Sequence, residues 1–170
     1  MARSCTLKGN ALPLEGPELK IGDTAPDATL KKSLVDDFQL SQAKGKARIY
    51  SVVPSLDTPV CAEQTRRFNK EVANLPGVEF YTISCDLPVA QARFCTAEKL
   101  DTTRFVTLSD HKDTSFGKAY GTLIPSLRIE SRAVFVIDKN DKVQYAEYVP
   151  EVASHPNYEA VLAAARKVGG

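Results

Sequence analysis

Cys61 is the side chain of this sequence best placed to do chemistry, because it stands in the expected first turn of a helix that directly follows an apolar strand. The strand is predicted over residues 47–53, a run rich in β-branched and aromatic residues that Pro54 ends. Thr58 suits the N-cap, and Pro59 suits the first helical position, where its missing N–H would be unpaired anyway. Cys61 is then the third helical residue.

Unpaired backbone N–H groups and the positive end of the helix dipole favour a thiolate over a thiol at this position of Cys61. A thiolate is a nucleophile, so the pattern predicts a reactive cysteine. The alternative is that Cys61 packs in the core as a small apolar residue without a chemical role. That alternative has support, because the helix carries a buried stripe at spacings of three and four. The stripe consists of Cys61, Thr65, Phe68, Val72 and Leu75.

The pattern Pro54-x-x-x-Thr58-x-x-Cys61 resembles the active-site signature of the peroxiredoxins. Further segments resemble the bacterial thiol peroxidases, the atypical two-cysteine subgroup of that family. They are residues 84–95 (SCDLPVAQARFC), 119–121 (AYG) and 132–138 (RAVFVID). The resemblance runs from about Gly9 to the C-terminal helix. Cys85 is a departure, because a small residue such as alanine is expected there.

The resemblance implies a thioredoxin-dependent peroxidase that reduces hydrogen peroxide and organic hydroperoxides. Cys61 would be the peroxidatic nucleophile and Cys95 the resolving cysteine, joined in an intrachain disulfide that thioredoxin or a similar dithiol protein reduces. Thr58 and Arg132 would steady the thiolate and the peroxide, and Pro54 would shield the site. The resemblance also implies a homodimer and requires no metal and no organic cofactor.

From the residues alone, several alternatives stay open. Cys85 competes with Cys95 as the partner of Cys61, and Cys95 could be a core residue beside Phe94. Arg132 could lie on the surface of a strand. Thr58 could be a simple N-cap and Pro54 a strand terminator.

Two other functions are also compatible with a reactive cysteine. One is a Cys/His hydrolase, which needs an imidazole within hydrogen-bond reach of the nucleophile; the candidates are His111 and His155, both in expected loops. The other is a non-enzymatic redox sensor or thioredoxin-like binding module, in which Cys61 oxidises without turnover.

Composition narrows the class of protein. The chain has 170 residues and a net charge of +1, with acids and bases mixed, so no basic patch indicates nucleic acid. No apolar run is long enough for a membrane span, and the N-terminus lacks the apolar region of a secretory signal. We therefore expect a cytoplasmic protein, a periplasmic one being less favoured. The four cysteines fit no zinc spacing, which leaves transient redox chemistry as their use in a reducing compartment.

Strands alternate with helices along most of the chain, and a hairpin and a helix follow. This order indicates an α/β domain with a mixed sheet flanked by helices and resembles the thioredoxin fold. We expect a single domain over residues 1–170, with an N-terminal hairpin extension over about 1–20. The expected strands are 47–53, 78–84, 105–109, 133–138 and 142–148, and the expected helices are about 60–75, 88–100, 115–120 and 158–168. Asp86 is the expected cap of the 88–100 helix.

In such folds the reactive crevice lies off the carboxyl ends of the parallel strands, so Cys61 and the start of the 88–100 helix should share one edge. Neighbouring helices pack about 8–10 Å apart, whereas a disulfide needs Cα atoms within about 7 Å. Joining Cys61 to Cys95 therefore requires local remodelling. Cys85 is expected to be buried on rigid sheet, on the same face as Ile83 and Tyr81, whereas Cys95 lies on a helix that can unwind.

Overall fold

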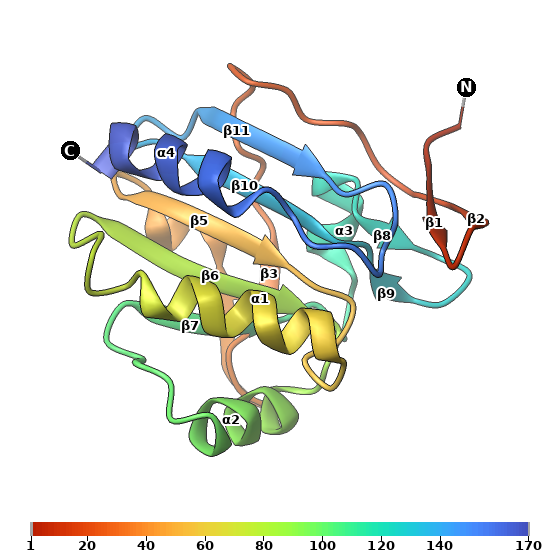
Figure 1. Cartoon of the computed structure of the whole chain (residues 1–170), viewed down its shortest axis with the longest axis horizontal. Coiled ribbons are helices and arrows are strands. Elements are labelled where there is room, and N and C mark those ends of the chain that lie inside the picture. The colour runs from red at the N-terminus through yellow and green to blue at the C-terminus, as the bar shows by residue number, and fades with distance from the viewer. Residues whose placement is uncertain (1, 170) are drawn as a thin grey trace.

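Seven strands form one mixed sheet in the computed structural model, which describes residues 2–169 (Figure 1). In spatial order they are β11 (Val143–Tyr148), β10 (Ala133–Ile137), β5 (Ala47–Val52), β6 (Val78–Ser84), β7 (Phe105–Ser109), β3 (Thr29–Lys31) and β4 (Asp37–Gln39). Strands β5, β6 and β7 are parallel, and the remaining pairings are antiparallel. The predicted mixed sheet is therefore confirmed. Residues 1 and 170, which the single-domain prediction includes, lie outside the described range.

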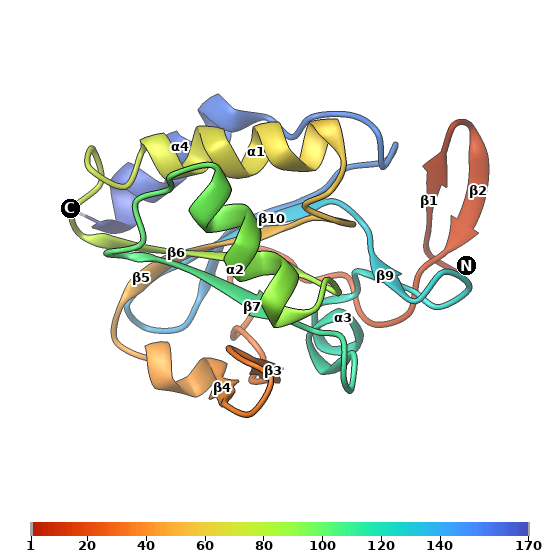
Figure 2. The same cartoon turned by 90° about the horizontal axis from the view of Figure 1, so that it is seen from below.

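Helices cover both faces of the sheet (Figure 2). On one face lie α1 (Pro59–Lys70) and α4 (Tyr158–Gly169), and α2 (Pro88–Ala97) packs on β7. On the other lie α3 (Ser115–Tyr120) and the 3₁₀ helix η1 (Leu40–Ala43). Every residue of β5 is buried, as expected for a central strand with both faces covered.

The alternation of side chains along β5 divides the core in two. Ile49 packs with Phe68 of α1 and Val161 of α4. Tyr50 points the other way and packs with Phe116 and Tyr120 of α3. Two hydrophobic layers thus cover the two faces of the sheet and fix the positions of its strands, including the ends of β5 and β6 that lead into α1 and α2.

The main elements agree with the sequence predictions, within a few residues at their ends. The predicted N-terminal hairpin is present as β1 (Ser4–Leu7) and β2 (Asn10–Pro13). The first helix ends at Lys70 rather than near residue 75, but Val72 and Leu75 of its predicted stripe are still buried in the turns that follow. The sequence analysis missed β3, β4, η1 and the short pair β8 (Leu123–Ile124) and β9 (Ile129–Glu130).

The N-terminal hairpin is fastened to the segment that follows β11. The amide of Thr6 donates to the Pro150 carbonyl, and the amide of Val152 donates to the Thr6 carbonyl, both at 2.8 Å. The Glu151 carboxylate accepts from the Thr6 hydroxyl and from the amides of Lys8 and Gly9. The hairpin therefore fixes the position of residues 150–152.

Across residues 2–169, no helix combines the length and the apolar character needed to cross a membrane.

Candidate active site

Cys61 lies where the sequence placed it, as the third residue of α1, after Thr58 at the N-cap and Pro59 at the first position. The Thr58 hydroxyl does not cap the helix; it donates to the Ser55 carbonyl at 2.8 Å. Its oxygen thus keeps lone pairs that can accept a hydrogen bond at the mouth of the site. Cys61 itself is 1% exposed.

Arg132 is the polar partner of Cys61. Its Nη2 lies 3.2 Å from Cys61 Sγ, its Nη1 donates to Gln64 Oε1 at 2.9 Å, and its Nε donates to the Val152 carbonyl at 2.9 Å. Arg132 is 2% exposed and stands directly before β10. The alternative of a surface strand residue is therefore wrong.

The charge of Arg132 lacks a carboxylate counter-ion: among the residues that the structure describes, no Asp or Glu forms a salt bridge with it. A buried charge is costly unless an opposite charge or several hydrogen bonds compensate it. The Cys61 sulfur is the group within reach that can supply a negative charge. The geometry therefore favours a thiolate paired with the guanidinium.

Gln64 is a site residue that the sequence analysis missed. It is fully buried on α1, and its Nε2 donates to the Ser51 hydroxyl at 2.8 Å. That bond fixes the orientation of the amide, so that Oε1 faces Arg132. The available signal was a polar side chain three residues after Cys61, next to the apolar stripe of the same helix.

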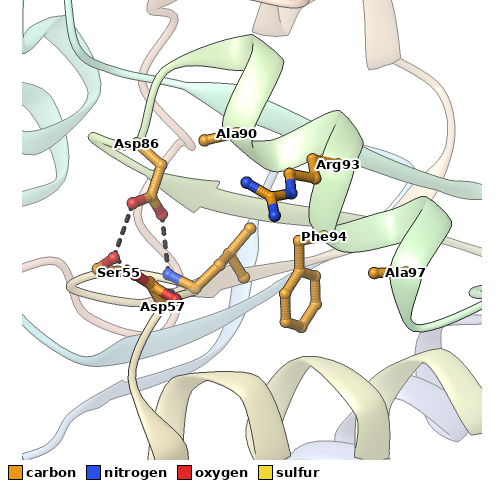
Figure 3. Close-up of a pocket in the computed structure, with 8 residues that line it drawn as sticks. Ser55, Asp57, Asp86, Ala90, Arg93, Phe94 and Ala97 are labelled. Atoms are coloured by element: carbon orange, nitrogen blue, oxygen red, sulfur yellow. Dashed lines mark hydrogen bonds between the residues drawn. The ribbon is translucent and has the colours of Figure 1, made fainter.

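Apolar side chains close over the sulfur. Val53, Leu56 and Cys61 form a buried cluster against which Phe94 of α2 packs. Pro54 is buried between β5 and Leu56. On the outer side of Leu56 and Phe94 is an open pocket of about 590 Å³ between the 54–58 loop and α2 (Figure 3).

Cys95 does not join this cluster. It packs half-buried against the core layer under α1 and α4, and all four cysteines are free thiols. Burial raises the pKa of the Cys95 thiol, although a hydrogen bond with Thr107 acts in the opposite direction. The structure therefore brings Phe94 rather than Cys95 next to Cys61, and a bond between the two sulfurs requires α2 to move.

Cys85 follows β6 and is half-buried, less enclosed than the sequence analysis expected. Its sulfur lies 3.8 Å from Glu130 Oε1. Burial, together with the neighbouring carboxyl groups of Glu130 and Asp110, raises the pKa of the Cys85 thiol. Carboxyl groups around this sulfur disfavour the thiolate that a resolving cysteine needs.

Asp86 does not cap α2, so that prediction was wrong; Leu87 occupies the N-cap, and no side-chain hydrogen bond caps the helix. The Asp86 carboxylate is instead engaged by the loop before α1. It accepts from the Ser55 hydroxyl at 2.7 Å and from the Leu56 amide at 2.8 Å. A tertiary contact has replaced the local one.

Neither histidine serves Cys61. The exposed His155 pairs through Nδ1 with the Tyr158 hydroxyl at 2.7 Å, and His111 lies in the turn after β7. Within the described chain, the hydrogen-bond partner of the Cys61 sulfur is Arg132, so the arrangement does not support a Cys/His hydrolase.

Comparisons with known proteins agree with this chemistry. A family model described as Redoxin matches residues 20–162. The thiol peroxidase of Oceanobacillus iheyensis is 54% identical over 157 residues, covering 92% of this chain and 94% of that protein. The chain belongs to the redoxin family, among its thiol peroxidases. The thiol peroxidase of Bacillus subtilis is similar to the same extent, at 53% identity over 95% of each chain.

Solved structures of redoxins share the fold. A peroxiredoxin-like protein from Aquifex aeolicus matches with a TM-score of 0.89 and 40% identity, over 99% of this chain and 98% of that one. A thiol peroxidase from Chromobacterium violaceum matches in fold with a TM-score of 0.85 at 21% identity, over 96% of this chain and 95% of that one. The predicted thioredoxin-like fold and the predicted peroxidase class are both confirmed.

Proposed function

We propose that this thiol peroxidase reduces hydrogen peroxide and organic hydroperoxides with Cys61 as the peroxidatic nucleophile and Cys95 as the resolving cysteine. One observation carries the first part. The buried guanidinium of Arg132 lies 3.2 Å from the Cys61 sulfur and forms no salt bridge with a carboxylate of residues 2–169.

In the first step the Cys61 thiolate attacks one peroxide oxygen and the O–O bond breaks. The second oxygen leaves as alkoxide or hydroxide and takes up a proton, and the sulfur is oxidised to a sulfenic acid. Negative charge thus moves from sulfur to the leaving oxygen. Arg132 offers planar donors at the place where this charge develops, which is the kind of contact that lowers a barrier most.

Thr58 is proposed to orient the peroxide. Because its hydroxyl proton is given to the Ser55 carbonyl, its oxygen is free to accept a hydrogen bond from the hydroperoxide O–H. Pro54 has no N–H and is buried in the loop, so it adds an apolar wall that keeps water from the thiolate.

In the second step the Cys95 thiolate attacks the Cys61 sulfenic sulfur. The S–S bond forms, the S–O bond breaks, and the hydroxide that leaves takes up a proton from solvent to give water. Two observations favour Cys95 over Cys85. Its neighbour Phe94 already packs at Cys61, so unwinding α2 brings residue 95 toward the sulfur. The pKa of the Cys95 thiol is raised mainly by burial, which opening removes, whereas carboxyl groups also surround Cys85.

The resemblance to thiol peroxidases supports the rest of the proposal. A dithiol protein, thioredoxin or one like it, reduces the disulfide and restores both thiols. The active assembly is a homodimer, and the compartment is the cytoplasm. None of these steps requires a metal or an organic cofactor.

The test uses Cys61→Ser, Cys95→Ser and Cys85→Ser, with one equivalent of peroxide followed by alkylation and non-reducing peptide mapping. We expect Cys61→Ser to lose oxidation, Cys95→Ser to stop at the sulfenic acid, and Cys85→Ser to form the Cys61–Cys95 disulfide as the wild type does. A Cys61–Cys85 bond in the wild type would refute the resolving assignment. Sustained peroxide consumption with thioredoxin and its reductase separates the enzyme from a redox sensor.

A further inference from the structure

Asp86 joins the loop that carries the Cys61 helix to the strand end that precedes α2 (Figure 3). Its Oδ1 accepts from the Ser55 hydroxyl at 2.7 Å, and its Oδ2 accepts from the Leu56 amide at 2.8 Å and from the Ser84 hydroxyl at 2.7 Å. The Asp86 carbonyl accepts from the Ser109 hydroxyl at the end of β7. One half-buried carboxylate therefore connects the 54–58 loop to the carboxyl end of strand β6.

The same network reaches α2. The Ser84 hydroxyl, which donates to Asp86, accepts from Gln91 Nε2 at 3.0 Å, and Gln91 Nε2 also donates to the Leu108 carbonyl at 2.9 Å. These bonds fix the start of α2 on the sheet. They continue without a break from the Ser55 hydroxyl to Gln91 of the helix.

The start of α2 has little further polar support. Its N-terminus has no side-chain cap, and the buried Oε1 of Gln91 finds no donor among residues 2–169. Uncapped helix ends and buried acceptors without partners both lower the local stability of a segment. The network centred on Asp86 therefore supplies much of the polar attachment of the start of α2, beside the apolar packing of Phe94 and Cys95 further along the helix.

Opening this network uncovers Cys61. Leu56, whose amide Asp86 holds, packs with Cys61, and Phe94 of α2 closes the same cluster. In Figure 3 the Phe94 ring points from α2 toward α1. Cys95 is the next residue, so the motion that removes Phe94 is also the motion that frees the resolving thiol.

We propose that Asp86 is a positioning residue that couples the peroxidatic loop to α2. While its hydrogen bonds hold, Cys61 is kept in the buried arrangement beside Arg132 in which peroxide oxidises it. When they break, the loop and α2 release together and Cys95 reaches the sulfenic sulfur. The inference rests on the proposed Cys61–Cys95 disulfide for its catalytic consequence, but not for the coupling itself.

The experiment compares Asp86→Ala with the wild type, with Asp86→Asn as the conservative variant and Asp57→Ala as the control. Asn can keep the three contacts with its oxygen toward Leu56 and its nitrogen toward Ser55, so it loses the charge only. Asp57 is an exposed carboxylate that lines the same pocket and accepts no side-chain hydrogen bond from the described residues. Ser55→Ala, which removes one contact at the pocket rim, serves if Asp86→Ala does not fold.

Two measurements decide the matter. In the reduced protein, hydrogen exchange should rise at residues 55–58 and 89–95 together in Asp86→Ala, with the amides of β5 and β6 unchanged. In stopped flow, the rate of disulfide formation relative to the rate of Cys61 oxidation should rise at least about tenfold, because Asp86→Ala removes three hydrogen bonds to a carboxylate and the loss of one alone accounts for about that factor. Asp86→Asn, which keeps the contacts without the charge, should lie between the wild type and Asp86→Ala, and Asp57→Ala should equal the wild type.

An unchanged rate ratio, or a rise in exchange at one segment alone, would overturn the proposal. So would an equal rise in exchange throughout β5 and β6, which marks general destabilisation. A wild type that forms no Cys61–Cys95 disulfide contradicts the proposed function instead, and the exchange measurement on the reduced protein then still tests the coupling.

Discussion

Arg132→Lys tests whether the guanidinium geometry, rather than its charge alone, drives the oxidation of Cys61. Arg132 reaches three acceptors at once, namely Cys61 Sγ, Gln64 Oε1 and the Val152 carbonyl. A lysine ammonium keeps the charge, but as a compact group on a flexible stem it cannot span the same three acceptors. At least one contact is lost.

The magnitude follows from the contacts. A hydrogen bond to a charged group contributes about 1.5–3 kcal/mol. If the lost contact is the one to the reacting sulfur, the rate constant for peroxide should fall roughly 10- to 150-fold. If the lysine ammonium instead keeps the hydrogen bond to the Cys61 sulfur, the buried oxygen of Gln64 or Val152 is left unpaired, which lowers the free energy of unfolding by about 1–3 kcal/mol. Because the reaction changes the charge at the sulfur and the peroxide, and not at the Gln64 or Val152 oxygen, we expect the loss of rate to dominate.

The assay is stopped-flow oxidation of the reduced enzyme in the Cys95→Ser background, where the proposed reaction ends at the sulfenic acid, together with urea unfolding. Arg128→Lys is the matched control, because Arg128 is exposed and donates to the Lys112 carbonyl. Oxidation at the wild-type rate by Arg132→Lys, with a clear loss of stability, would refute the reasoning and assign Arg132 to the fold.

Two further predictions concern pH. Burial and the neighbouring Asp110 raise the pKa of Glu130, so the folded state keeps a proton that the unfolded state releases above about pH 4.3, and this contribution to stability is lost as pH rises. Between about pH 5 and about pH 8, the free energy of unfolding in urea should therefore fall less steeply with pH for Glu130→Gln than for the wild type. Equal slopes for the two proteins would contradict this prediction. For Glu151 the sign is opposite: hydrogen bonds from Thr6 and then from the Lys8 amide lower the pKa of this carboxyl to about 2. The carboxylate stabilises the hairpin above about pH 4.3, and this stabilisation is lost as pH falls toward 2. Amide hydrogen exchange of residues 4–13 should therefore be faster in Glu151→Gln than in the wild type at neutral pH, and the two proteins should exchange alike in acid. Equal exchange at neutral pH would contradict this prediction.

The placement of Cys61 could be predicted from the sequence because every signal for it is local. A β-branched run ends at Pro54, Thr58 stands at the N-cap, and Pro59 opens the helix, all within a few residues of the thiol. Local backbone preferences decide where such a helix begins, and the packing of the sheet is compatible with that start. The third-position cysteine follows from them.

The short strands were missed for the opposite reason. β3 and β4 have three residues each, and β8 and β9 have two, so none carries enough alternation to be recognised. Their pairing partners fix them instead: a single Lys31–Ser109 pairing attaches β3 to the edge of the sheet. Asp86 failed as a predicted cap in the same way, because donors about 30 residues earlier, Ser55 and Leu56, outcompete the helix for its carboxylate.

The sequence motif contains Arg132 but not the residues that position its guanidinium. Its guanidinium is aimed at the sulfur by Gln64, which Ser51 orients, and by the Val152 carbonyl. Val152 is held in turn by the Thr6 carbonyl of the N-terminal hairpin. The donors that we propose to stabilise the reacting charge are thus positioned by strand β5, helix α1 and the N-terminal hairpin, whose Thr6 is 145 residues from Glu151 in the chain. These elements converge only in the folded protein. Under the proposed mechanism the rate depends on donors fixed in advance, and so on the whole fold; the hairpin is then expected to contribute to catalysis although it reaches Cys61 only through Val152 and Arg132.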